Sequence, residues 1–316
     1  MHSEKITAFY QALIKASEPS GPLARMVRIS AEEQQVHAGE CDDPIGDRAH
    51  ARCAQGRLIH RYPDRVLLLV TDRCPAHCRF CFRKQRIEAG AGDVTDAELE
   101  AVVGYLGAHP AVKEVILSGG DPLSLSDSRL LEIVRILKGG AGVETLRIHT
   151  RYPVYEPARC AGLEAVAAQV DVFVLHVNHR RELSPDFGKA MAVLRGSALL
   201  LSQSVLLKGV NDTVPELEAL VRGLAAVGIL PYYLHYPDRA RGTEHFRMPI
   251  EAAMALVETL QGNLPGYRIP KLVLDIPGGH GKVELSRRSI RRLSPGRYEL
   301  TSPISGLAIE YREDEG

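Results

Sequence analysis

Three cysteines follow an apolar run and lie close enough in sequence to bind one group. Residues 66–70 are continuously apolar and predict a strand buried on both faces. Cys74, Cys78 and Cys81 come next, with the spacing Cys-x3-Cys-x2-Cys. Pro75 prevents the stretch from simply becoming a helix, so a loop can wrap three thiolates around a single group. Thiolates at this density favour a soft metal centre.

Zinc and iron–sulfur centres place different demands on such a loop. A closed structural zinc site needs four ligands, and no fourth cysteine or paired histidine lies nearby in ligand spacing, although His77 lies inside the loop. An iron–sulfur cube held by three cysteines leaves one iron open to a small molecule. Buried structural cysteines have no reason to cluster beside a strand end. A non-catalytic zinc module would contain zinc and neither iron nor labile sulfide.

The cysteine spacing after a first strand resembles that of the radical S-adenosylmethionine (SAM) enzymes. Three further stretches resemble the lysine 2,3-aminomutase family: His60-Arg61-Tyr62-Pro63-Asp64-Arg65, Cys81-Phe82-Arg83 and Leu117-Ser118-Gly119-Gly120-Asp121-Pro122-Leu123. The resemblance extends from about Asp43 to Lys282. It implies a [4Fe-4S] cluster on the three cysteines, with SAM chelating the open iron and being cleaved to a 5′-deoxyadenosyl radical after reduction.

Further residues are candidates for binding SAM. Gly119 and Gly120 allow positive φ and a close approach of backbone to a ligand. By resemblance, their motif, which continues into Asp121, contacts the amino group of SAM. His176 and Gln203 follow later predicted strands and are additional candidate cofactor ligands.

A second informative stretch, residues 277–282, reads Pro-Gly-Gly-His-Gly-Lys. The Walker phosphate loop fails here, because Ile276 and Val283 occupy positions that need Gly and Ser or Thr. A partly desolvated lysine beside glycines can form a Schiff base with an aldehyde, although in isolation a solvated lysine is the favoured interpretation. The run resembles the aminomutase segment whose lysine carries pyridoxal 5′-phosphate (PLP), which assigns that role to Lys282. By the same resemblance, Arg61 and Arg65 anchor the phosphate.

Three residues bear on the substrate. Arg83 resembles the group that binds the substrate carboxylate, and Asp238 and Asp275 match the carboxylates that hold the side-chain ammonium of lysine. Two carboxylates at the end of a pocket favour a cation, although either aspartate alone is also explained as a surface or helix-cap residue. The implied reaction moves the α-amino group of L-lysine to carbon 3 through a PLP external aldimine. Arginine or ornithine would also satisfy an acidic pocket.

Two departures from the family's long members leave alternatives open. No cysteine follows Cys160, so the zinc-binding cysteines near their C-terminus are missing. His235 replaces a tyrosine of the long enzymes and matches the short relatives that make β-lysine for elongation factor P, which usually lack the Pro-Gly-Gly-x-Gly-Lys run. A radical SAM enzyme without PLP is a further alternative. No role is assigned to Cys41, Cys53 or Cys160.

The elements that position these residues alternate between strand and helix patterns. Predicted strands cover residues 66–70, 114–118, 144–149, 172–178, 198–207, 231–236 and 271–275. Predicted helices cover residues 96–106, 126–137, 163–169, 185–194, 214–227 and 250–260, several with caps at Thr95, Ser126, Ser184 or Thr213. Six strand–helix repeats predict an α/β fold, a radical SAM partial (β/α)6 TIM-type barrel with catalytic groups at the carboxyl ends of the strands. The candidate residues do follow predicted strands.

We expect three segments along the chain. Residues 1–60 form an N-terminal helical and loop extension, residues 61–262 the partial barrel, and residues 263–316 a C-terminal segment that carries the PLP lysine. Residues 298–302 and 306–311 predict a terminal hairpin.

Composition limits the remaining functions. The 316 residues have a formal net charge of zero, which argues against a general nucleic-acid surface. No apolar stretch approaches the roughly 20 residues that span a bilayer. The first residues lack the order of a secretory signal, so we expect a cytoplasmic protein whose cysteines stay thiols or metal ligands. The resemblance implies a homo-oligomer, and an electron donor such as flavodoxin or ferredoxin is expected.

Overall fold

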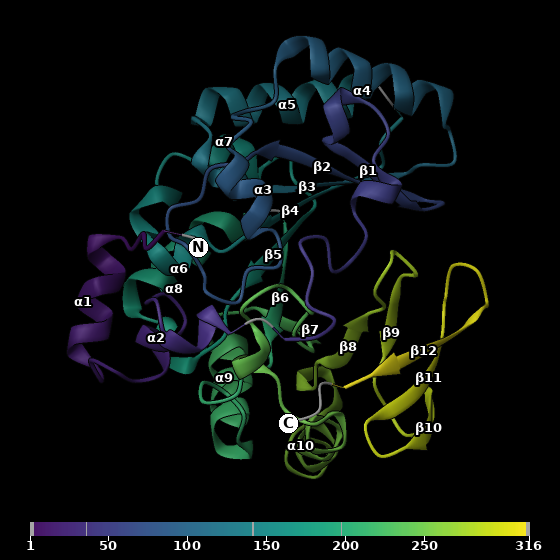
Figure 1. The fold of residues 1–316 in the computed structure, drawn as a ribbon. Helices are drawn as coiled ribbons and strands as arrows, with labels where there is room; N and C mark the ends of the chain where they lie inside the picture. The colour runs from purple at the N-terminus through teal and green to yellow at the C-terminus, as the bar shows by residue number, and fades with distance from the viewer. Residues whose placement is uncertain (1–2, 36, 141, 197, 314–316) are drawn as a thin grey trace.

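A nine-stranded sheet whose strands follow one another in sequence order forms the body of the protein (Figure 1). The structure, a computed structural model, describes residues 3–35, 37–140, 142–196 and 198–313. Seven neighbouring strands are parallel: β2 (Arg65–Thr71), β3 (Glu114–Gly119), β4 (Thr145–Thr150), β5 (Val172–His176), β6 (Leu199–Val205), β7 (Leu230–His235) and β8 (Lys271–Asp275). Antiparallel strands β1 (Leu58–Tyr62) and β9 (Lys282–Glu284) close the two edges.

Helices lie on the outer side of this curled sheet, from α4 and α5 at the top of Figure 1 to α9 and α10 at the bottom. The long crossover helices are α4 (Asp96–Ala108), α5 (Asp127–Gly140), α8 (Pro185–Arg195), α9 (Val214–Ala226) and α10 (Ile250–Asn263). Shorter turns complete the β4–β5 crossover: α6 (Tyr152–Tyr155), η5 (Pro157–Cys160) and α7 (Glu164–Ala167). The partial barrel predicted from six strand–helix repeats is confirmed.

Local sequence signals explain the helix starts. The side chains of Thr95, Ser184 and Thr213 accept hydrogen bonds from backbone N–H groups three residues on, and Ser126 accepts from Arg129 N in the same way. These contacts satisfy N–H groups that have no partner inside the helix. The four predicted caps are therefore confirmed.

Two predicted strands end earlier than expected. Val205 N donates to the Asn178 side chain at 2.9 Å, and Leu207 N donates to the Asn211 side chain at 2.7 Å. These amide oxygens take backbone donors that the strand ladder would otherwise use, so β5 ends at His176 and β6 at Val205. The sequence did not predict the β1–β2 hairpin, whose strands join at the Tyr62–Arg65 pair.

The segment after residue 263 contributes to two sheets. Strands β8 and β9 belong to the main sheet, whereas β10 (Ile290–Ser294), β11 (Arg297–Thr301) and β12 (Ala308–Arg312) form a separate antiparallel sheet. The predicted terminal hairpin is confirmed as β11 and β12.

The N-terminal segment packs against the cysteine loop. It contains α1 (Ala8–Ala16), α2 (Pro22–Arg25) and the turns η1 (Ala31–Gln34), η2 (Arg48–His50) and η3 (Ala54–Gly56). Lys5 Nζ donates to Cys74 O at 2.6 Å, and His77 N donates to Lys5 O at 2.9 Å. Remaining short elements are α3 (Lys84–Ala89), η4 (Pro122–Ser124), η6 (Arg180–Glu182), η7 (Glu244–Phe246) and η8 (Gly266–Arg268). Within the described ranges, every helix is too short or too polar to cross a membrane.

Candidate active site

The cysteine loop leaves β2 at the carboxyl edge of the sheet. Burial together with the charges of Asp121 and the neighbouring thiolates raises the pKa of Cys74 well above its usual value. Burial, followed by the charge of Cys78, raises the pKa of Cys81 to about 12. The thiols thus lie close enough to oppose one another's ionisation, a cost that a bound cationic metal centre removes.

Among the described residues, no group of three or more His, Cys, Asp or Glu side chains is arranged to hold a single metal ion. In a [4Fe-4S] cluster, Cys74, Cys78 and Cys81 would each bind one iron. The donor set of three thiolates in one loop fits the cluster.

Gly119 and Gly120 lie against the start of the cysteine loop. Gly119 has φ +123°, and a Cβ there would lie 2.2 Å from Thr71 O. A Cβ on Gly120 would lie 2.3 Å from Arg73 O. The close approach of residues 119 and 120 to the backbone of Thr71 and Arg73 therefore requires glycine at both positions, independently of any ligand. Their contact with SAM stays a prediction.

Asp121 joins the ends of two strands. Its carboxylate accepts hydrogen bonds from Thr150 Oγ1 and Arg151 N, both at 2.7 Å, and from Leu123 N at 3.1 Å. Burial raises its pKa to about 6 in spite of these donors. Asp121 therefore braces the loop after β3, and direct contact with SAM stays a prediction.

His176 and Gln203 face each other across neighbouring strands, as paired residues of β5 and β6. His176 Nε2 lies 3.0 Å from Asn178 Oδ1, and its ring lies 5.6 Å from that of Phe80 in the cysteine loop. Burial and the Arg151 charge hold the pKa of His176 well below its usual value. The structure thus places His176, as a neutral ring, beside the cysteine loop, and Gln203 opposite it on the neighbouring strand; contact of either residue with SAM stays a prediction.

The turn before Lys282 places its ammonium group against the carboxylate of Asp275. Gly278, Gly279 and Gly281 have φ values of 83°, 84° and 90°, which side chains strongly disfavour. The turn pairs Lys282 directly opposite Asp275, and Lys282 Nζ donates to Asp275 Oδ2. Although burial raises the pKa of Asp275, the Lys282 charge lowers it overall.

His235, at the end of β7, completes this group. Its Nδ1 lies 3.4 Å from Lys282 Nζ, and its Nε2 is buried without a hydrogen-bond partner within the described residues. Burial and the Lys282 charge lower the pKa of His235 to about 3, so the ring is neutral. Lys282 Nζ also lies 5.6 Å from the centre of the Tyr233 ring.

The two arginines predicted to hold phosphate are placed differently. Arg61 approaches the lysine group, with Nη1 3.8 Å from Asp275 Oδ1, and its Nε is buried without a partner within the described ranges. Arg65 pairs with Asp64 at 2.7 Å and lies 3.9 Å over the Tyr62 ring. Tyr62 in turn accepts a hydrogen bond from Lys282 N at 2.9 Å.

The predicted substrate residues lie at the same end of the barrel. Arg83 donates from Nε and Nη2 to Asp47 Oδ2, at 3.0 and 2.8 Å. Burial and the Asp275 charge raise the pKa of Asp238 to about 8, and Arg83 and Lys282 partly oppose that rise. The predicted PLP and substrate residues are therefore electrostatic neighbours.

Sequence reasoning missed Asp47 and His149. Asp47 accepts from Arg61 at 2.9 Å as well as from Arg83, so it joins the predicted phosphate and carboxylate anchors. His149 lies on β4, and its Nε2 is buried without a partner within the described ranges. Asp47 lies in a loop without periodicity, and His149 lies inside a strand, so neither carried a local signal.

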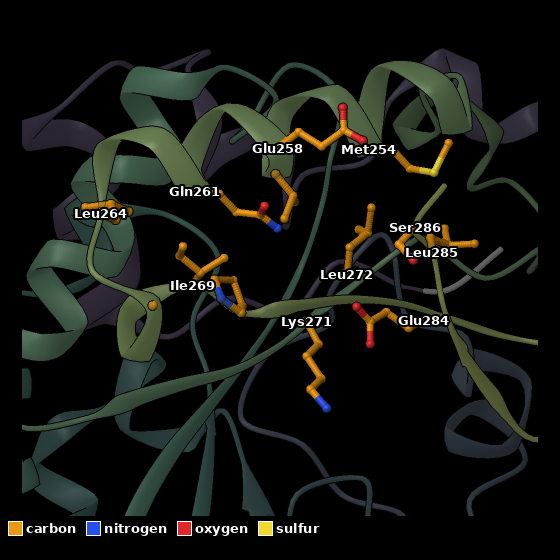
Figure 2. A pocket seen from close by; sticks show the side chains of 13 residues that line it. Met254, Glu258, Gln261, Leu264, Ile269, Lys271, Leu272, Glu284, Leu285 and Ser286 are labelled. Carbon is orange, nitrogen blue, oxygen red and sulfur yellow. The ribbon is translucent and has the colours of Figure 1, made fainter. Parts of the chain in front are cut away.

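A surface groove lies apart from these residues. It has a volume of about 440 Å³ and lies between α10 and the β8–β9 hairpin (Figure 2). Met254, Glu258, Lys271 and Glu284 are among its lining residues. None of the predicted site residues lines it.

A parallel half-barrel with a Cys-x3-Cys-x2-Cys loop after its first parallel strand defines a radical SAM enzyme. The sequence pattern of the Radical SAM superfamily matches residues 68–195. Putative L-lysine 2,3-aminomutase of Treponema pallidum is 38% identical over 289 residues, 90% of this chain and 81% of that protein. L-lysine 2,3-aminomutase of Fusobacterium nucleatum is 33% identical over 316 residues, 98% of this chain and 73% of that protein.

The protein of the same name from Escherichia coli is 35% identical over 277 residues, 86% of this chain and 80% of that protein. The chain therefore belongs to the L-lysine 2,3-aminomutase family, and this membership implies SAM and a [4Fe-4S] cluster. Among solved structures, the radical SAM enzyme coproporphyrinogen III oxidase of E. coli aligns at 15% identity and a TM-score of 0.40, over 64% of this chain and 53% of its own. That similarity is too low to bear on the assignment.

Proposed function

We propose that this enzyme moves the α-amino group of L-lysine to carbon 3, with PLP held by Lys282. The observation that supports this proposal is the grouping of one lysine, one neutral histidine and two carboxylates at the ends of β7 and β8. The names of the relatives support the same substrate.

The buried polar atoms near Lys282 fit a phosphorylated aldehyde. Arg61 Nε and His235 Nε2 lack partners within the described residues, and such buried donors or acceptors are costly when unpaired. In the proposal, Arg61 and Arg65 bind the phosphate. When bound, the reduced cluster and SAM supply the radical that abstracts hydrogen, and PLP carries the nitrogen during its migration.

In the proposed cycle, Asp275 binds first the Lys282 ammonium and then the side-chain ammonium of the substrate. In the free protein it holds the Lys282 ammonium. When Lys282 is engaged elsewhere, Asp275 is released to bind the substrate side-chain ammonium together with Asp238. Arg83, now paired with Asp47, binds the substrate carboxylate at the other end.

The proposal is tested by supplying lysine, arginine, ornithine, glutamate and alanine separately, under anaerobic reducing conditions with SAM and PLP. Mass spectrometry detects the β-amino isomer, and we expect lysine to be converted best. Asp238→Asn and Asp275→Asn should each lower kcat/KM for lysine by roughly 30- to 150-fold, because each removes a charge-assisted contact of about 2–3 kcal/mol. Lys282→Ala should abolish the pyridoxyl label trapped by borohydride.

Asp186→Asn serves as the control, since Asp186 is an exposed aspartate on α8 that pairs with Lys189 at 2.9 Å. Iron and PLP contents should stay at parental levels in the Asp238→Asn protein. Preferred conversion of glutamate or alanine, or full activity of Asp238→Asn with lysine, would contradict the proposed acidic pocket. If arginine or ornithine were converted best, the proposed acidic pocket would stand, and the proposed substrate would change to that amino acid.

A further inference from the structure

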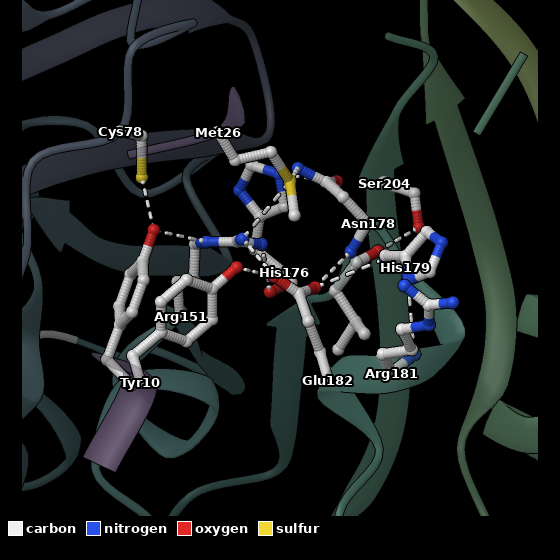
Figure 3. A network of polar contacts seen from close by, with 12 residues as sticks. Tyr10, Met26, Cys78, Arg151, His176, Asn178, His179, Arg181, Glu182 and Ser204 are labelled. Atoms are coloured by element: carbon white, nitrogen blue, oxygen red, sulfur yellow. Dashed lines mark hydrogen bonds and ion pairs between the residues drawn. The ribbon is translucent and has the colours of Figure 1, made fainter. Parts of the chain in front are cut away.

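One buried side chain outside the chemistry described so far touches a cysteine of the loop. The Tyr155 hydroxyl, at the end of α6, lies 2.9 Å from Cys78 Sγ. The dashed line that leaves Cys78 in Figure 3 marks this contact. Tyr155 is 1% exposed. Within the described ranges, no other side chain forms a hydrogen bond with the sulfur of Cys74, Cys78 or Cys81.

The direction of this hydrogen bond follows from a second contact. Arg151 Nε donates to the Tyr155 oxygen at 2.9 Å, and a guanidinium has no acceptor. The single hydroxyl proton is therefore free to point toward Cys78. A thiolate bound to iron carries no proton and can only accept, so the contact persists with Tyr155 as the donor.

A buried ion pair holds this donor in place. Arg151 Nη2 lies 2.5 Å from Glu182 Oε1, and these side chains are 6% and 0% exposed. Tyr10 OH donates to the same carboxylate oxygen at 2.8 Å, and Arg151 Nη1 donates to His176 O at 2.9 Å (Figure 3). Turning Tyr155 away would leave a buried Arg151 donor unpaired, which is costly.

We propose that Tyr155 donates a hydrogen bond to the Cys78 thiolate of the bound cluster and thereby raises its one-electron reduction potential, with Arg151 and Glu182 fixing the hydroxyl. One electron from an external reductant adds negative charge to the cluster and its sulfur ligands. A donor aimed at sulfur stabilises the reduced form more than the oxidised form. The inference rests on Cys78 as a cluster ligand and not on the identity of the substrate.

The test compares two tyrosines of the same network. Tyr155→Phe removes the hydroxyl that reaches sulfur, whereas Tyr10→Phe removes an equally buried hydroxyl whose hydrogen bond, among the described residues, is to Glu182. Each protein is loaded with iron and sulfide anaerobically, and its cluster is titrated with dithionite, without SAM, while the reduced form is followed by electron paramagnetic resonance.

We expect a more negative midpoint potential for Tyr155→Phe. At the parental midpoint, the ratio of reduced to oxidised cluster should fall about tenfold, equivalent to about 59 mV for one electron. Tyr10→Phe should leave the midpoint unchanged. Equal midpoints for Tyr155→Phe and the parent, or equal shifts in both variants, would overturn the inference.

A second measurement covers the case in which Tyr155→Phe fails to load its cluster. Pulsed resonance spectra of the reduced parent protein and of Tyr10→Phe, in H2O and D2O, should show an exchangeable proton strongly coupled to the cluster. Absence of that proton from the parent would overturn the inference without any variant. Loss of SAM cleavage or of lysine turnover alone would bear on the proposed function instead.

Discussion

At the scale of single residues, Asp238 is a buried carboxyl group surrounded by charges of both signs. Its nearest charges include the carboxylates of Asp275 and Asp47, which oppose ionisation, and the cations Lys282 and Arg83, which favour it. Burial adds the largest effect, and the pKa rises to about 8. Near neutral pH the side chain is therefore mostly protonated, and an incoming ammonium would displace the proton.

This raised pKa predicts a pH dependence of stability. Between the usual value near 3.8 and about 8, folded Asp238 keeps a proton that the unfolded chain has lost. The free energy of unfolding therefore falls as pH rises through this window. Asp238→Asn cannot ionise, so its stability relative to the parent should rise between pH 5 and pH 8.5 by at least about 1.4 kcal/mol, the equivalent of one pKa unit.

Urea denaturation at several pH values measures this difference. Asp186→Asn, at an exposed site, should differ from the parent by a small amount that does not change with pH. Parallel pH curves for Asp238→Asn and the parent would show that Asp238 ionises normally.

At the scale of elements, the contact between β3 and the cysteine loop sets the position of the predicted cluster. Gly120 N donates to Thr71 O at 2.7 Å, and Asp121 N donates to Arg73 O at 2.8 Å. These bonds extend the pairing of β2 and β3 beyond the strands, and a Cβ on Gly119 or Gly120 would collide with the backbone that leads into the cysteine loop. The cysteines begin one residue later.

Gly119→Ala tests this contact. The added Cβ would meet Thr71 O at 2.2 Å in a backbone conformation with φ +123°, so we expect destabilisation on the order of 3 kcal/mol or more and reduced iron loading. Gly104→Ala is the matched control, because Gly104 lies in α4 and a Cβ there meets nothing within 4 Å. It should stabilise the protein by up to about 1 kcal/mol. Equal urea midpoints and iron contents for both variants would rule out the proposed crowding.

At the scale of the whole molecule, the N-terminal segment is fastened to the cysteine loop by a buried ion pair. Arg79 donates from Nε and Nη2 to Glu33 at 2.8 and 2.5 Å, and the side chains are 1% and 2% exposed. Glu33 precedes Arg79 by 46 residues, so the pair ties the N-terminal segment to the loop that carries the three cysteines. An electron donor and a homo-oligomer stay predictions at this scale.

Removing one charge of the Arg79–Glu33 pair should lower the free energy of unfolding of the protein. Glu33→Gln removes the negative charge that pairs with the buried Arg79 guanidinium, and we expect a loss on the order of 3–5 kcal/mol in urea denaturation. Glu32→Gln changes the neighbouring residue, which is half exposed and 3.9 Å from Arg25, and should cost little. A Glu33→Gln protein as stable as Glu32→Gln would contradict the role of the pair.

The sequence by itself determined the order of elements and the position of the cysteine loop. Apolar runs, helix caps and turn glycines act over a few residues, so the six repeats and the Lys282 turn could be predicted from local patterns. Because parallel strands present their carboxyl ends at one edge, the candidate residues could also be expected to gather there.

Only the tertiary structure decided which side chains face one another. Asp47 joins Arg61 and Arg83 although 14 and 36 residues separate them, and Tyr155 reaches Cys78 across 77 residues. The Asn178 side chain accepts from Val205 N on the neighbouring strand, 27 residues away. Such contacts depend on how far the sheet curls and on which loops pack beside it. Both are set by the burial of many side chains at once, which no short stretch of sequence encodes.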